Sequence, residues 1–126
     1  MNYRIIALFL FFSLMACDHN EAVNPVVITD DPPQLGTTSA VIEGNIKETG
    51  SIRPIKYGFL WDSLSGLNIL TAKHRIDLGP TDVNIIYQVA LTGLTANTQY
   101  FVKAYAANTD YSMIYYGNEV PFKTLP

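Results

Sequence analysis

The sequence is poor in the residues that usually build reactive or metal-binding centres. It has one cysteine, Cys17, and two histidines, His19 and His74. A lone cysteine has no partner for an internal disulfide. Asp77 lies three residues after His74, and that spacing puts two side chains on opposite faces of a strand. No paired acids, glycine-rich phosphate loop or Ser-His arrangement is visible either. We therefore expect no metal, no cofactor and no enzymatic activity.

Basic clusters and long apolar spans are also absent. After residue 16 the chain keeps seven Lys and Arg against eleven Asp and Glu, a net charge of −4. Nucleic-acid binding needs a basic footprint, so we expect no nucleic-acid partner. The apolar stretch 5–16 has twelve residues and is ended by the polar residues 18–21. A membrane-spanning helix needs about 20 apolar residues, so this stretch is too short to be one.

Residues 1–16 have instead the parts of a secretory signal, with Arg4 before the apolar stretch and small residues before a cleavage site. The segment Leu14-Met15-Ala16-Cys17 resembles the bacterial lipobox, whose cysteine becomes the diacylated mature N-terminus. Two or three acyl chains make membrane attachment effectively permanent, at about 0.8 kcal/mol per buried methylene. We expect a cleaved lipoprotein signal peptide and lipidation of Cys17. The alternative is an ordinary secretory signal in which Cys17 is an incidental small residue.

The remaining 110 residues suffice for one domain and leave no room for a second. Residues 17–25 are mostly polar and are predicted to form a lipidated tether. Residues 26–126 are predicted to form the domain. No internal repeat or low-complexity tract interrupts them.

Apolar residues alternate with polar ones throughout this domain, and turn residues separate the runs about every ten positions. No segment carries a helical stripe, so the pattern predicts an antiparallel sandwich or barrel. A first strand, 26–28, is expected to end at residues 30–33 because Pro32 and Pro33 cannot donate to a ladder. Further strands are expected at 39–46, 56–61, 69–76 (an edge strand), 85–91, 100–107 and 119–123. Seven strands of this spacing indicate an all-β sandwich of the immunoglobulin class, and the missing cysteine pair excludes the antibody type.

The alternation also predicts which side chains form the core. We expect one face of each strand to point inward, and Gly44 to leave room for close packing. The expected inward residues are Ala40, Ile42, Ile46, Tyr57, Phe59, Trp61, Ile85, Tyr87, Val89, Leu91, Tyr100, Val102, Ala104, Ala106, Val120 and Phe122.

Residues 91–108 resemble the E–F corner and F strand of a fibronectin type III domain. Leu94, followed six residues later by Tyr100, matches the tyrosine corner, in which the hydroxyl returns to the backbone near Leu94. Residues 57–61 and 116–124 resemble the variant of this domain found in envelope lipoproteins of Gram-negative bacteria. The resemblance implies a fibronectin type III sandwich on the outer membrane. One departure is the missing tryptophan of the B strand: Gly44 lies near that place, and Trp61 is expected to fill the core instead.

If Tyr100 and Val102 point inward, their neighbours on the same strand face outward. Together with the connection after residue 107, they predict an apolar ligand or partner surface. Its expected members are Phe101, Tyr105, Tyr111, Met113 and Tyr115. Two alternatives remain open: neighbouring loops cover this surface, or residues 111–116 extend a long hairpin.

Two functions fit these features. The first is a membrane-anchored, non-catalytic module of the cell envelope that binds a protein or serves as a spacer. The second is a carbohydrate-binding accessory of a glycan-uptake or hydrolase system, because planar aromatic rings suit stacking on sugars. No Arg-Gly-Asp occurs, so integrin-type adhesion is not supported. The outer membrane is expected from the resemblance, whereas Asp18 and Glu21 leave the membrane face open.

Overall fold

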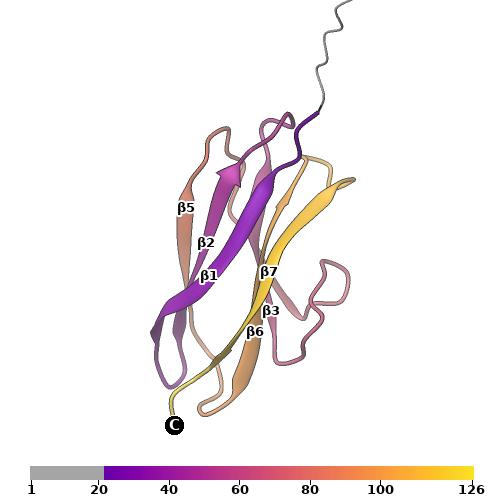
Figure 1. Ribbon diagram of the computed structural model, residues 1–126. Coiled ribbons are helices and arrows are strands. Elements are labelled where there is room, and N and C mark those ends of the chain that lie inside the picture. Colours follow the sequence, from indigo (N-terminus) through magenta and orange to yellow (C-terminus); the bar gives the residue numbers. More distant parts are fainter. Residues whose placement is uncertain (1–21) are drawn as a thin grey trace, which may run out of the picture.

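The computed structural model describes residues 22–126, so the signal segment and Cys17 lie outside the described residues. It has seven strands in two antiparallel sheets, which confirms the predicted all-β sandwich (Figure 1). One sheet has the order β1-β2-β5 and the other β4-β3-β6-β7. Across residues 22–126 no helix is long and apolar enough to span a membrane. The strands are β1 (Val26–Leu35), β2 (Ala40–Glu48), β3 (Lys56–Asp62), β4 (His74–Asp77), β5 (Ile86–Leu91), β6 (Gln99–Ala107) and β7 (Ile114–Lys123).

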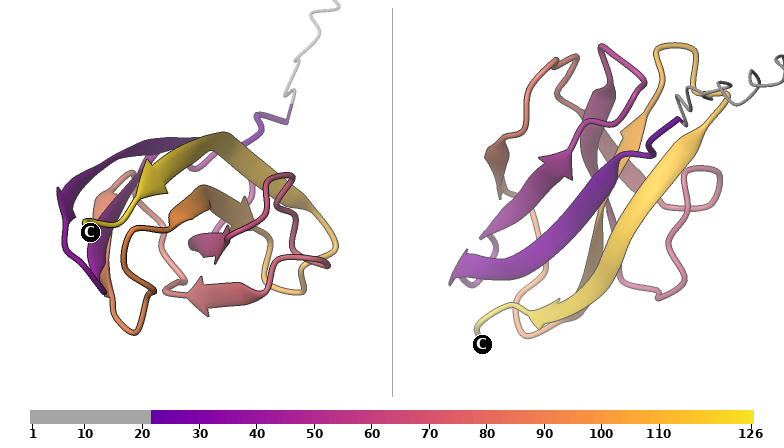
Figure 2. Two further views of the ribbon diagram at one scale, coloured as in Figure 1. Left: turned by 90° about the horizontal axis from the view of Figure 1, so that it is seen from below. Right: turned by 45° about the horizontal axis from the view of Figure 1, so that its top comes forward.

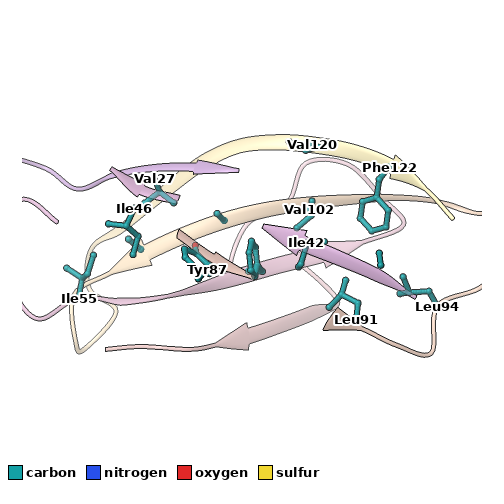
Figure 3. Close-up of a cluster of buried hydrophobic side chains, with 14 residues drawn as sticks. Val27, Ile42, Ile46, Ile55, Tyr87, Leu91, Leu94, Val102, Val120 and Phe122 are labelled. Atoms are coloured by element: carbon teal, nitrogen blue, oxygen red, sulfur yellow. The ribbon is translucent and has the colours of Figure 1, made fainter. Parts of the chain in front are cut away.

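The main core lies between the two sheets and takes side chains from both (Figure 3). It contains most of the residues that the alternation predicts to point inward, among them Ile42, Phe59 and Val102, which are fully buried. Their polar neighbours on β2 and β5, such as Glu43 and Gln88, lie on the outer face and join in a side-chain hydrogen bond of 2.7 Å. The alternation of apolar and polar residues therefore predicted correctly which face of each sheet points inward.

The space beside Gly44 is filled by Tyr87 from β5. A Cβ at Gly44 would lie 2.6 Å from the Tyr87 ring, so only glycine permits this approach. The Tyr87 hydroxyl donates to the backbone oxygen of Gly58 (3.1 Å), and burial raises the pKa of Tyr87 well above its usual range. Trp61, which was expected to fill the core, packs against it but is only half-buried. Its ring also stacks on His74, with 5.3 Å between ring centroids and 13° between planes.

Strand β1 does not end at its prolines, which corrects the sequence-based expectation. Pairing with β2 shifts between Asp30 and Gln34, so that a bulge takes up Pro32 and Pro33 before pairing resumes. This is possible because β1 is an edge strand, where a missing N–H breaks no second ladder.

Two other strands differ in length from the prediction. The edge strand expected at 69–76 is shorter and begins at His74, because a turn with hydrogen bonds to Asn68 occupies residues 68–72. At the other end of the chain, β7 begins at Ile114 and pairs there with Ala107 of β6. Residues 114–116 therefore extend the hairpin, which was one of the two open alternatives.

The crossing from β5 to β6 is tied by Tyr100. Its hydroxyl accepts a hydrogen bond from the N–H of Thr95, the residue after Leu94, at 2.9 Å. Leu94 itself is buried in the main core. The side chain of Tyr100 also stacks against Phe122 of β7, with 5.7 Å between centroids.

Candidate functional site

The outer face of the four-stranded sheet is covered by a second, smaller apolar cluster. Leu60 of β3 and Tyr105 of β6 are fully buried there, although they point away from the main core. Leu67, from the loop 63–73 between β3 and β4, packs on them. In Figure 1 this loop projects beside β3 and β7. The remaining members, buried or partly buried, are Ile69, Ala72, Phe101, Ala107, Tyr111 and Ile114.

The placement of Tyr105 corrects the predicted ligand surface. Its ring was expected on the exterior, but its exposed fraction is 0%, because the loop 63–73 lies over it. Phe101 is half-buried against the same cluster. The structure therefore supports both open alternatives: a neighbouring loop covers this face, and residues 114–116 extend the hairpin.

The other predicted surface residues lie in or beside the β6–β7 turn. Tyr111 has a positive φ of 60°, which is unusual for a large side chain, and its ring lies 5.0 Å from the Lys56 ammonium and 5.0 Å from the Arg75 guanidinium. Burial raises the pKa of Tyr111, and the nearby carboxylate of Asp77 raises it further. Tyr111 thus lies against charged side chains of β3 and β4.

Met113 is about half-exposed at the same turn. Tyr115 is half-buried, with its hydroxyl 3.4 Å from the Asn24 side-chain oxygen, so it contacts the segment that leads into the domain. All four aromatic residues of the predicted surface, Phe101, Tyr105, Tyr111 and Tyr115, therefore make contacts within the protein.

The loop 63–73 is held on the sheet by charged side chains of β6 and β7. The Glu119 carboxylate accepts hydrogen bonds from the N–H groups of Gly66 (3.1 Å) and Leu67 (2.8 Å). Lys103 donates to the Leu67 oxygen at 2.7 Å and lies 3.8 Å from the same carboxylate. The Tyr116 hydroxyl accepts from the N–H of Ile69 at 2.9 Å. Side chains of the sheet thus bind both N–H donors and a carbonyl acceptor of the loop backbone.

Asp62 closes the loop by joining its two ends. One carboxylate oxygen accepts from the N–H of Lys73 (3.0 Å), and the other lies 3.4 Å from the N–H of Leu64. Burial by itself would raise the pKa of Asp62, but hydrogen bonds from the backbone N–H groups of Lys73, Ser63 and Leu64 outweigh it and lower the pKa below its usual value. A compact surface loop with joined ends is a common carrier of function.

We predict that Asp62→Asn lowers the free energy of unfolding by about 1–2 kcal/mol at pH 7, because a charged acceptor is lost from two backbone hydrogen bonds. The pKa of Asp62 is lower in the folded protein than its ordinary value of 3.8. The extra free energy of unfolding that the wild type gains from the charged Asp62 is therefore fully present above pH 3.8 and is lost as the pH falls through the pKa of the folded protein. Urea unfolding from pH 2 to pH 7 measures this difference. The exposed Asp82→Asn is the control, and a difference between wild type and Asp62→Asn that does not change with pH would contradict the prediction.

The fixed loop turns two leucines toward solvent. Leu64 is 70% exposed and Leu70 is 91% exposed. The tip is shaped by Asn68, whose side-chain oxygen accepts from the N–H groups of Leu70 (2.8 Å) and Thr71 (3.1 Å). Sequence alternation did not identify either leucine, although the apolar residues 64, 67, 69 and 70 between two strands were a readable signal. The loop offers apolar contact area on a fixed backbone.

A separate polar hollow of about 320 Å³ lies at the end of β3, between the starts of β4 and β6. It is next to the Trp61–His74 stack, and its wall includes His74. The other lining residues are Asp62, Ser63, Lys73, Gly93, Thr95, Thr98 and Tyr100. Within the described part of the chain, no three His, Cys, Asp or Glu side chains come together to hold a metal ion.

No protein-family model matches the chain, and no curated protein matches it significantly. Similar solved structures exist for the sensor domain of the anti-sigma factor RsgI4 in Pseudobacteroides cellulosolvens. Its short form has a TM-score of 0.63 and 19% identity, over 80% of this chain and 94% of that domain. Its long form has a TM-score of 0.59 and 19% identity, over 81% of this chain and 90% of that one. A solution structure of the domain gives 0.57 and 18%, over 81% and 76%. This likeness shows that the two chains share a fold.

Proposed function

We propose that this chain is a lipid-anchored, non-catalytic binding module of the cell envelope that contacts a protein partner through the loop 63–73. The observation that carries the proposal is a loop that is fixed on a sheet and yet exposes Leu70 at 91%. Loops on a rigid scaffold commonly carry binding residues, and a preordered loop avoids part of the entropy cost of association. The shared fold with a sensor domain is consistent with a binding or sensing role.

The anchor in this proposal is Cys17, within the segment that resembles a lipobox. The first strand begins at Val26, so eight residues of sequence lie between the anchor and the domain. Eight residues, 18–25, span at most about 26–29 Å when fully extended. The module is therefore held near the membrane, which we propose to be the outer membrane.

The finer fold assignment, a fibronectin type III domain, belongs to the same proposal. It is supported by the hydrogen bond between the Thr95 N–H and the Tyr100 hydroxyl, since a tyrosine at this corner that bonds back to the backbone is typical of immunoglobulin-like sandwiches.

The double variant Leu64→Ser, Leu70→Ser tests the partner surface. Both side chains are exposed, so we expect the unfolding midpoint to stay close to that of the wild type. We expect a partner that co-purifies with the full chain from the native envelope to be reduced at least tenfold. Leu125→Ser, an exposed leucine outside the loop, is the matched control. Equal recovery of the partner with the double variant would refute this surface.

A second candidate function is carbohydrate binding, favoured by the polar hollow beside His74. Its threonine and serine hydroxyls suit sugar hydroxyls, and Trp61, the single tryptophan of the chain, lies against His74 as a fluorescence reporter. A glycan screen that follows Trp61 emission tests this candidate. Saturable binding that is lost in Lys73→Ala would favour it over a protein partner, and no response to any glycan would reject it.

A further inference from the structure

The four edges of the two sheets are not equally protected. On one side, β1 and β7 lie against each other in both views of Figure 2. The Asn118 side chain accepts from the Thr29 N–H (2.9 Å) and donates to the Thr29 oxygen (3.0 Å), so it occupies backbone groups of the β1 edge. A Cβ at Gly117 would lie 3.0 Å from the Thr29 nitrogen, so the two strands leave no room for another between them.

On the opposite side, the β4 edge carries exposed charges. Arg75 and Asp77 form an ion pair of 3.0 Å on a strand of only four residues. Short edge strands with charged side chains discourage pairing with another chain. This edge is therefore protected against pairing with a strand of another chain.

The β5 edge has none of these protections. The strand Ile86–Leu91 contains no charged residue and no proline, and among residues 22–126 it pairs only with β2. The N–H of Ile46 donates to the oxygen of Ile85 at 2.8 Å, which makes this pair hydrogen-bonded. Because such pairs alternate along an antiparallel ladder, the N–H and C=O groups of residues 86, 88 and 90 point away from β2.

We propose that β5 accepts an extended segment of a partner polypeptide as an additional strand of the sheet. Backbone donors and acceptors that repeat every second residue match the backbone of an extended chain. Ile86, which is 65% exposed, and the exposed Val83 supply apolar contact at one end of this edge. This surface is distinct from the loop 63–73, which lies on the other sheet.

A second copy of this chain fits the edge less well than a different polypeptide, and this step rests on the proposed lipid anchor. Antiparallel pairing of two β5 strands across a two-fold axis reverses one domain, so that the two N-termini lie at opposite ends. A ten-residue strand such as β1 is about 33 Å long. With the strands upright on the membrane, one tether would have to return along that length, which exceeds its reach of about 26–29 Å. Parallel pairing across a two-fold axis would set like backbone groups against each other.

The test uses the full chain in its native host, with the photoreactive p-benzoyl-phenylalanine in place of Ile86. We expect one discrete adduct, mapped by mass spectrometry to a single segment of a partner. Gln88→Pro removes an N–H that points away from β2, so the adduct should fall at least tenfold while the fold persists. Gln88→Ala keeps that N–H, and its adduct should stay within twofold of the unsubstituted chain.

If Gln88→Pro lowers the unfolding midpoint, Ala90→Pro removes another outward N–H and replaces it in the comparison. The inference is overturned if no adduct forms, if the adduct joins two copies of this chain, or if neither proline reduces it. The double variant Leu64→Ser, Leu70→Ser should leave the adduct unchanged, which separates this edge from the loop surface. Membrane pelleting of the same samples reports on the anchor independently.

Discussion

Replacing Tyr105 with alanine is expected to lower the free energy of unfolding by about 3–5 kcal/mol, the usual cost of deleting a buried aromatic ring. Tyr105 is completely buried and packs with Leu60 and Leu67 beneath the loop 63–73. Its removal leaves a cavity where the loop rests on the sheet, so the loop loses its apolar support as well. Urea unfolding at pH 7 measures the effect.

The conservative variant Tyr105→Phe separates packing from hydrogen bonding. The Tyr105 hydroxyl lies 3.5 Å from the backbone oxygen of Ile76, at the outer limit of a hydrogen bond. We therefore expect Tyr105→Phe to cost less than about 1 kcal/mol. Replacing a surface tyrosine with alanine usually lowers the free energy of unfolding by less than about 0.5 kcal/mol. A loss that small for Tyr105→Ala would contradict its burial and support the exterior placement expected from the sequence.

Replacing Cys17 with alanine is expected to move the protein from the membrane pellet to the soluble fraction. The lipobox-like segment predicts that this cysteine carries the acyl chains. Two or three acyl chains hold a protein on the membrane at about 0.8 kcal/mol per buried methylene. A domain of net negative charge without a basic cluster offers no electrostatic attachment that could replace them. Fractionation and metabolic labelling with a radioactive fatty acid measure the change.

The matched control for this variant is Ser13→Ala, which alters the same segment and leaves the cysteine in place. It should remain in the pellet and keep its label. Undiminished pelleting and labelling of Cys17→Ala would refute lipidation at this residue.

The inner faces of the sheets were predictable because each strand alternates under one local rule. Ile42, Phe59 and Val102 all point inward as their spacing requires, and each is fully buried. Strand ends were less predictable, since they depend on neighbours. A proline such as Pro32 would end a central strand. However, β1 is an edge strand, and a bulge lets it continue past Pro32.

The candidate site depends on which segment covers the outer face, and alternation along one strand carries no information about that. Leu60 and Tyr105 are as apolar as their inward neighbours, which is typical of strands buried on both faces. That signal was present in β3 and β6, but the covering loop was predicted to be partly strand. Glu119 and Lys103 could not be assigned, because their partners are backbone groups some 36 to 53 residues away along the chain.

Amide hydrogen exchange in the loop 63–73 tests most directly whether this loop is a fixed surface. We predict slow exchange for the N–H groups of Gly66, Leu67 and Ile69, which donate to Glu119 and Tyr116, and much faster exchange of the first two in Glu119→Ala. Exchange of these three amides in the wild-type protein at the rate of an unstructured peptide would contradict it.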